Sequence, residues 1–155
     1  MTSLMKKSNI IIVEGEPNSI FFEIFFKVIK KYKSKNPLIL ICCKNRFNLQ
    51  AKKFNFKKKL NLVKLNDIKN NQLKKNTINI LDVPYKNLLN SNINNKLKKQ
   101  YIKKCFELAF KLIKLKISKK LLNGPINKKV FFDKKFLGVL LNTFLKYLIK
   151  KILVC

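Results

Sequence analysis

Residues 123–128 read Asn-Gly-Pro-Ile-Asn-Lys, and their side chains are well suited to holding a small anionic ligand. Gly124 permits close approach of the backbone to a ligand, and Pro125 stiffens the loop. Asn127 offers both a donor and an acceptor, and Lys128 offers a cation for a phosphate or carboxylate group. A substrate loop and an ordinary surface loop beside one of many lysines explain this segment equally well.

A second candidate loop, Gly15-Glu16-Pro17, follows the short β-branched run from Ile10 to Val13. In open α/β sheets, ligands bind beyond the carboxyl ends of the strands, where a tight turn can direct backbone N–H groups at a substrate. On spacing alone, an ordinary strand-to-helix turn is favoured over a binding turn.

Strands and helices that alternate along the chain must position these two loops. Apolar runs and turn residues predict strands at 10–13, 38–42, 60–65, 78–81 and 121–122, with helices at 20–31, 46–53 and 96–115. The polar stretch 66–76 is expected to be a loop, and 86–95 to be irregular. This alternation predicts an α/β layered fold with a largely parallel sheet.

The first expected helix, 20–31, carries two apolar series at helical spacing. One consists of Ile20, Ile24 and Val28, and the other of Phe21 and Phe25. The pattern assigns both series to the apolar side of the helix.

The charge balance is strongly basic, with 36 Lys and Arg against 7 acidic residues and a net charge of +29. Taken alone, it points to nucleic acid or an anionic membrane surface. However, Arg46 is the sole arginine, whereas phosphate-binding surfaces usually include arginine because its planar fork grips phosphate with two hydrogen bonds. The abundance of Lys, Asn, Ile, Leu and Phe is typical of an AT-rich genome. A basic nucleic-acid-binding protein therefore remains the competing hypothesis, and no specific nucleic acid is expected as a partner.

The cysteines are Cys42, Cys43, Cys105 and Cys155, and they form no CxxC pair. With no histidine in the chain, a Cys/His zinc site is excluded. Free thiols, the absence of a signal-type apolar segment and the absence of an 18-residue apolar run predict a cytoplasmic protein without a membrane span.

The two loops, taken in order and in context, resemble the 4-hydroxythreonine-4-phosphate dehydrogenase family. Family members begin with a strand, a Gly-Asp/Glu-Pro turn and a helix carrying a Glu, which here correspond to 10–13, 15–17 and Glu23. They continue with a long helix, a short strand and a Gly-Pro-Ile/Val-Asn-Lys loop, which here correspond to 101–115, 121–122 and 124–128. The resemblance spans about residues 8 to 138.

This resemblance implies an incomplete isocitrate/isopropylmalate dehydrogenase-like architecture and an NAD-dependent reaction. The reaction oxidises and then decarboxylates a phosphorylated hydroxy amino acid in pyridoxal phosphate synthesis. The family forms homodimers and uses a zinc-type divalent metal held by three His. Carried over to this sequence, the resemblance makes Lys128 a catalytic cation. The substrate-binding residues that it implies are Gly15, Glu16, Pro17, Gly124, Pro125, Asn127 and Gly138.

The chain also departs from the family pattern. Val139 and Leu140 stand where the family has a substrate-contacting His and Thr, and the three metal-binding His have no counterpart. Family members are roughly twice as long. We therefore expect 1–138 to be the N-terminal α/β portion of a truncated dehydrogenase that is inactive alone. Residues 139–155 are expected to be a non-homologous amphipathic tail, for which we hypothesise a frameshift after about Gly138 or, alternatively, binding to an anionic membrane surface.

Overall fold

The computed structural model describes residues 9–32, 36–86 and 95–127. The chain divides into two compact units, 1–125 and 126–155, and every helix and strand described below belongs to the first unit. The predicted domain boundary after residue 138 and the amphipathic tail lie outside the described residues, and both stay predictions.

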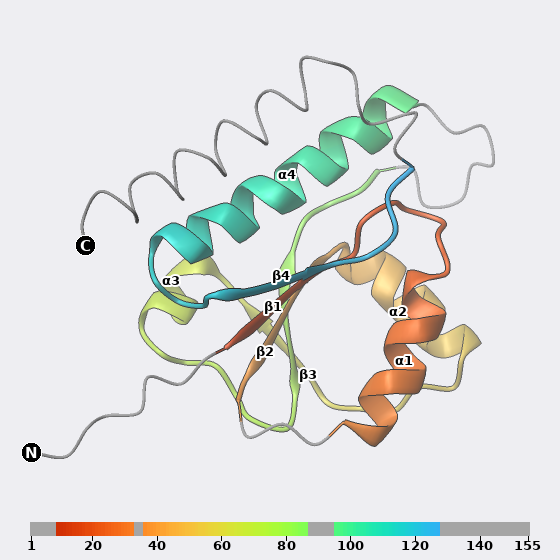
Figure 1. The fold of residues 1–155 in the computed structure, drawn as a ribbon. Coiled ribbons are helices and arrows are strands. Elements are labelled where there is room, and N and C mark those ends of the chain that lie inside the picture. Colours follow the sequence, from red (N-terminus) through yellow and green to blue (C-terminus); the bar gives the residue numbers. More distant parts are fainter. Residues whose placement is uncertain (1–8, 33–35, 87–94, 128–155) are drawn as a thin grey trace, which may run out of the picture. The chain divides into compact units, whose positions relative to one another are not determined.

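Five strands form one sheet in the order β3-β4-β2-β1-β5, and each pair of neighbours runs parallel (Figure 1). The strands are β1 (Ile10–Val13), β2 (Leu38–Cys42), β3 (Leu60–Val63), β4 (Ile78–Asp82) and β5 (Lys120–Asn123). All five residues of β2 are buried, as expected for a strand covered on both faces. The structure confirms the predicted α/β fold with a parallel sheet.

The strands are connected by α1 (Phe21–Lys31), α2 (Lys44–Lys53), α3 (Leu65–Lys69) and α4 (Asn95–Lys114). Helix α3 corrects the prediction that 66–76 is entirely loop. The Asp67 carboxylate accepts the backbone N–H of Lys64 at 2.7 Å, and Ile68 is fully buried. A capped turn anchored by one buried side chain is too short to produce a recognisable apolar period.

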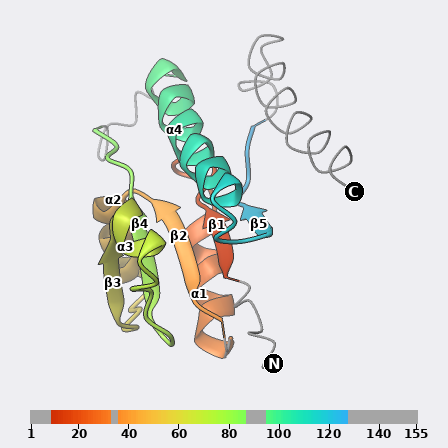
Figure 2. The same cartoon turned by 90° about the vertical axis from the view of Figure 1, so that its left-hand side faces the viewer.

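Helices cover both faces of the sheet (Figures 1 and 2). On one face, α1 and α2 pack together over an apolar cluster that includes alternate residues of β2 and β4. On the other face, α4 packs on β1 and β2. Because side chains alternate along a strand, Ile39 and Ile41 of β2 point away from the α1 side, and both are fully buried.

Only one of the two apolar series of α1 enters the core. Phe21 and Phe25 are buried, whereas Ile20, Ile24 and Val28 are 62%, 49% and 55% exposed. The prediction that both series share the apolar side was therefore wrong for the aliphatic series. Aromatic rings bury more apolar area than isoleucine or valine side chains. Phe22 and Phe26 lie on the same side of α1 as Phe21 and Phe25, so the side with the phenylalanines faces the core.

Strand β5 is fixed beside β1 by polar contacts at the amino-terminal ends of both strands. The Asn9 side chain donates to the carbonyl of Ile117 at 3.1 Å, and the Ser118 hydroxyl donates to the carbonyl of Asn9. Both side chains are buried, so these hydrogen bonds form away from competing water. They fix the register that sets where the opposite ends of β1 and β5 finish.

Helix α4 is the longest of the described helices, with 20 residues. Within 9–32, 36–86 and 95–127, neither it nor any other helix is apolar enough over a sufficient length to cross a membrane.

We expect Phe26→Ala to destabilise the fold strongly. The Phe26 ring is 1% exposed and lies 4.4 Å from the Phe56 ring and 5.3 Å from the Phe47 ring, centroid to centroid. Its removal leaves a cavity between α1 and α2, which costs about 3–5 kcal/mol in the free energy of unfolding. Chemical denaturation measures this loss. Phe110→Ala, at a half-buried position of α4, is the matched control and costs less; equal losses would contradict the assignment of Phe26 to the core.

Candidate functional site

The fold brings the two candidate loops together at the carboxyl ends of neighbouring strands. Val13 ends β1 and Asn123 ends β5, and these two residues are partners in the parallel register. The Gly15–Pro17 turn and the Gly124-Pro125 segment therefore begin side by side, although residues 18–123 separate them in sequence. This edge of the sheet is where α/β folds bind their ligands.

The two loops touch through their backbones. The N–H of Glu16 donates to the carbonyl of Pro125 at 2.8 Å, and the N–H of Gly124 donates to the carbonyl of Val13 at 2.8 Å. A Cβ atom on Gly124 would lie 2.0 Å from the carbonyl oxygen of Glu14, and one on Gly15 would lie 2.6 Å from that of Pro125. Both glycines are thus required by the close approach of one loop to the other.

The turn after β1 contains two residues in the left-handed region. Gly15 has φ +81° and Asn18 has φ +68°, conformations that glycine and asparagine tolerate better than other residues. The N–H of Ser19 closes the turn on the carbonyl of Glu16 at 3.3 Å, and the Ser19 hydroxyl accepts the N–H of Phe21 at 3.3 Å. The turn therefore leads directly into the first residue of α1.

A buried ion pair lies beneath this turn. Glu14, the residue after β1, is 1% exposed, and its Oε1 accepts a hydrogen bond from Nε of Arg46 at 3.0 Å. The hydroxyl of Tyr101 donates to the other carboxyl oxygen of Glu14 at 2.5 Å and itself accepts the N–H of Cys43 at 2.8 Å. The residue that follows β1 thus meets residues of α2 and α4 at one carboxyl group.

The guanidinium group of Arg46 has further partners. Its Nη1 donates to the side-chain oxygen of Asn18 at 2.8 Å, and the group lies 5.8 Å from the centre of the Tyr85 ring. The Tyr85 and Tyr101 rings are 5.0 Å apart. A second ion pair joins Lys98 to Glu16, the residue after Gly15, at 3.1 Å and is nearly buried.

Burial raises the pKa of Glu14 above its ordinary value, and the neighbouring Arg46 opposes this rise. Burial also raises the pKa of Tyr101, of Cys42 and of Cys105. The tyrosine hydroxyl and these two thiols therefore stay protonated at neutral pH. A buried protonated thiol is a poor nucleophile, so Cys42 and Cys105 are core residues rather than reactive groups.

The residues present do not fit the metal that the resemblance implies. The sequence has no histidine, and the described ranges contain no group of three or more Cys, Asp or Glu that could hold an ion. The Gly15 turn does not form a pyrophosphate cradle for NAD either. The space beside Gly15 is filled by Gly124 and Pro125, and the first N–H of α1 is already bound by Ser19.

The structure places five of the predicted site residues in one cluster: Gly15, Glu16, Pro17, Gly124 and Pro125. Asn127 is described but belongs to the second unit. Lys128, Gly138, Val139 and Leu140 lie outside the described residues, and their assigned roles remain proposals.

Sequence reasoning missed the side chains that surround the turn, namely Glu14, Arg46, Lys98 and Tyr101. One signal was present, because Arg46 is the only arginine among 36 basic residues and Glu14 is one of 7 acidic ones. No short-range pattern links them, since Glu14 and Tyr101 are 87 positions apart.

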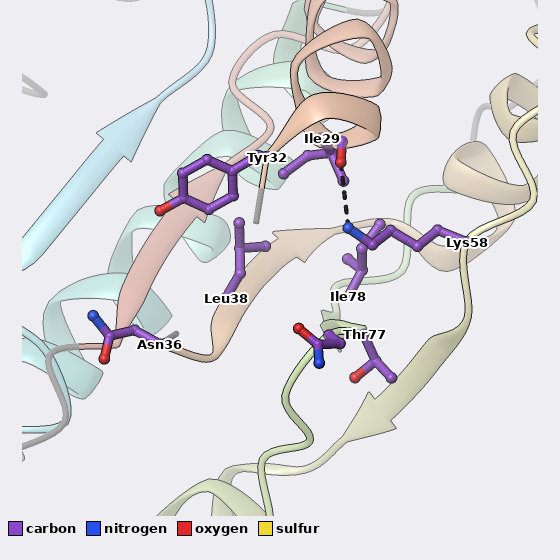
Figure 3. A pocket seen from close by; sticks show the side chains of 8 residues that line it. Ile29, Tyr32, Asn36, Leu38, Lys58, Thr77 and Ile78 are labelled. Carbon is purple, nitrogen blue, oxygen red and sulfur yellow. Dashed lines mark hydrogen bonds between the residues drawn. The ribbon is translucent and has the colours of Figure 1, made fainter. Parts of the chain in front are cut away.

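A pocket lies at the amino-terminal ends of the strands, whereas the loop site lies at their carboxyl ends (Figure 3). Leu38 and Ile78, the first residues of β2 and β4, line it together with Tyr32 and Lys58. The ammonium group of Lys58 donates to the carbonyl of Ile29 at 3.3 Å, near the carboxyl end of α1. This contact caps the helix, and the pocket has no part in the loop site.

No family model and no curated protein matches the sequence. Solved structures, in contrast, match its fold. One, assigned as a 4-hydroxythreonine-4-phosphate dehydrogenase from Salmonella typhimurium, has a TM-score of 0.64 at 18% identity over 79% of this chain and 39% of its own. The 4-hydroxythreonine-4-phosphate dehydrogenase from Klebsiella pneumoniae has a TM-score of 0.62 at 19% identity, over 80% of this chain and 38% of its own.

A third such enzyme, from Burkholderia phymatum, has a TM-score of 0.61 at 12% identity over 79% of this chain and 38% of its own. The predicted resemblance is thus confirmed at the level of the fold. This chain spans less than two fifths of the length of each of these solved structures.

We expect alanine at either glycine to disrupt the contact between the loops. Gly124→Ala places a methyl group against the backbone of Glu14, and Gly15→Ala also requires a positive φ. Each should lower the free energy of unfolding by roughly 3 kcal/mol or more, because backbone atoms cannot yield as a side chain can. Leu122→Ala, at a 59% exposed position of β5, is the control and should change stability little. Near-wild-type stability of Gly124→Ala in denaturant would exclude the backbone contact.

We expect the carboxyl group of Glu14 to titrate above 4.5 and that of Glu23 to titrate below it. Burial raises the pKa of Glu14, whereas a hydrogen bond from Lys27 lowers the pKa of exposed Glu23. The folded state then holds the proton of Glu14 more tightly than the unfolded chain does. Its contribution to stability is therefore full below the unfolded pKa and is lost as pH rises through the folded pKa. Side-chain carboxyl NMR shifts measure both groups, and the reverse order would refute this environment for Glu14.

Proposed function

We propose that this chain forms the substrate-loop portion of an NAD-dependent 4-hydroxythreonine-4-phosphate dehydrogenase. The observation that carries the proposal is the meeting of the Gly15–Pro17 turn with Gly124-Pro125 at the carboxyl edge of the sheet. The two motifs on which the resemblance was drawn are far apart in sequence, and the fold joins them through backbone hydrogen bonds. The likeness of the fold to three solved dehydrogenases supports the same assignment.

The ligand is a phosphorylated hydroxy amino acid, which a complete enzyme of this kind oxidises and decarboxylates in vitamin B6 synthesis. Lys128 supplies a cation for its phosphate or carboxylate group, and Asn127 supplies a donor and an acceptor. The backbone N–H groups of Glu16 and Gly124 are already bound within the protein, so they shape the loop rather than contact the ligand. Gly15, Pro17, Pro125 and, after the Lys loop, Gly138 complete the proposed substrate-binding set.

The 155-residue chain does not perform the reaction alone. No three histidines exist to hold a metal, and the Gly15 turn offers no cradle for the cofactor. The charge that develops at the reacting oxygen therefore lacks its main stabiliser. Homodimer formation and a cytoplasmic location are part of the proposal through the resemblance alone. The net charge of +29 causes only nonspecific, salt-sensitive attraction to polyanions.

We expect the chain to bind phosphorylated 4-hydroxythreonine without reducing NAD. Titration followed by NMR measures binding, and NADH absorbance measures turnover with added zinc. Lys128→Ala should weaken binding about tenfold, because it removes a charge-assisted contact. Lys119→Ala, at an exposed position before β5, is the matched control for general loss of positive charge.

The same titration with inorganic phosphate separates a specific site from attraction to any anion. Equal affinity for phosphate and substrate, or equal losses in the two lysine variants, would contradict a substrate loop. Substrate-dependent NADH formation would contradict the inactivity of the chain.

A further inference from the structure

Three separate parts of the fold form hydrogen bonds with the turn that follows β1. Arg46 comes from α2, and Lys98 and Tyr101 come from α4, while the Gly124-Pro125 backbone follows β5. Each contacts the stretch from Glu14 to Asn18 through a hydrogen bond of 3.1 Å or less. Arg46, Lys98 and Tyr101 themselves belong to neither motif on which the proposed function rests.

Arg46 spans the base of the turn. Its Nε binds Glu14 before the turn, and its Nη1 binds Asn18 near the end of it. The guanidinium group is planar, so its donors are fixed relative to one another, and one side chain sets the distance between the two ends. A lysine ammonium group could not impose this spacing, because its single nitrogen has freely rotating donors.

Tyr101 and Lys98 connect the same turn to α4. The hydroxyl of Tyr101 bridges the Glu14 carboxyl group and the N–H of Cys43, so it links the ends of β1 and β2. The ammonium group of Lys98 binds the carboxylate of Glu16, whose own N–H is bound to Pro125. Glu16 is therefore held on both sides, by its side chain and by its backbone.

The turn requires such support because its conformation is costly. Two of its residues have positive φ, and one of them, Asn18, carries a side chain. The burial of Glu14 adds a desolvation cost that only paired, hydrogen-bonded partners offset. Without these contacts, other conformations of the turn would compete with the one that lies against Gly124-Pro125.

We propose that Arg46, Tyr101 and Lys98 are positioning residues, which hold the Gly15–Pro17 turn against Gly124-Pro125 before any ligand arrives. This pre-organisation rests on the proposed function only for the identity of the ligand. A loop that is already ordered loses less conformational freedom on binding, so the three residues raise affinity without contacting the substrate.

The amide of Glu16 reports the turn directly, and the amide of Ile41 in central strand β2 reports global unfolding. We expect Lys98→Met to accelerate hydrogen exchange at Glu16 roughly fivefold relative to Ile41, the effect of losing one interaction of ordinary hydrogen-bond strength. Lys103→Met, which removes an exposed ion pair with Glu107 on the same helix, is the matched control and should leave the ratio unchanged.

Tyr101→Phe tests the second contact, since it deletes only the hydroxyl group. It should accelerate exchange at both Cys43 and Glu16 relative to Ile41, whereas Tyr32→Phe, at an exposed position after α1, should not. An unchanged Glu16-to-Ile41 ratio in both Lys98→Met and Tyr101→Phe would overturn the proposal, as would the same change in Lys103→Met.

Affinity for phosphorylated 4-hydroxythreonine provides the functional readout. In Lys98→Met combined with Tyr101→Phe, affinity should fall in proportion to the fraction of molecules with an open turn, which exchange measures independently. A wild-type chain that binds no substrate defeats the proposed function, while the exchange ratios still decide the positioning role. Unchanged affinity with a demonstrably opened turn would show that these residues are structural only.

Discussion

The close backbone contact between Gly15 and Gly124 is the constraint on which the candidate site depends. A Cβ atom added to either glycine would lie 2.8 Å or less from main-chain atoms of the facing segment. The contact is possible because β1 and β5 are parallel neighbours that end in register. It also explains why both loops need glycine without any reference to a ligand, since each glycine makes room for protein backbone.

The polar groups around this contact follow from the same geometry. Where β1 and β2 end, their side chains are still covered by α2 and α4, so Glu14 leaves the sheet into a buried environment. A buried carboxyl group needs partners, and Arg46 and Tyr101 supply them. The only arginine of a lysine-rich chain lies here, 5% exposed, where a planar donor can bind two residues at once.

Much of the fold was predictable because most of its helices and strands have a recognisable pattern of apolar and turn residues within their own short stretch of sequence. The run Ile10 to Val13 is β-branched and ends at a glycine turn, and the long helix near 96–115 has a clear apolar stripe. Local patterns did not predict the structure where packing against several distant residues determined it. Helix α3 rests on the single buried residue Ile68, and the buried side of α1 was settled by competition between two apolar series. In both cases packing against distant residues decided the outcome.

The sequence by itself determined the α/β class, the order of the elements and the two loops that contain glycine and proline, because turn residues and periodicity act over a few positions. Only the tertiary structure decided that these loops touch, and that Glu14, Arg46, Lys98 and Tyr101 surround them. The side-chain contacts among them join residues from 28 to 87 positions apart, and the two loops are farther apart still. A spacing of that length leaves no periodic trace in the sequence, since it depends on the strand order and on which helix covers each face of the sheet.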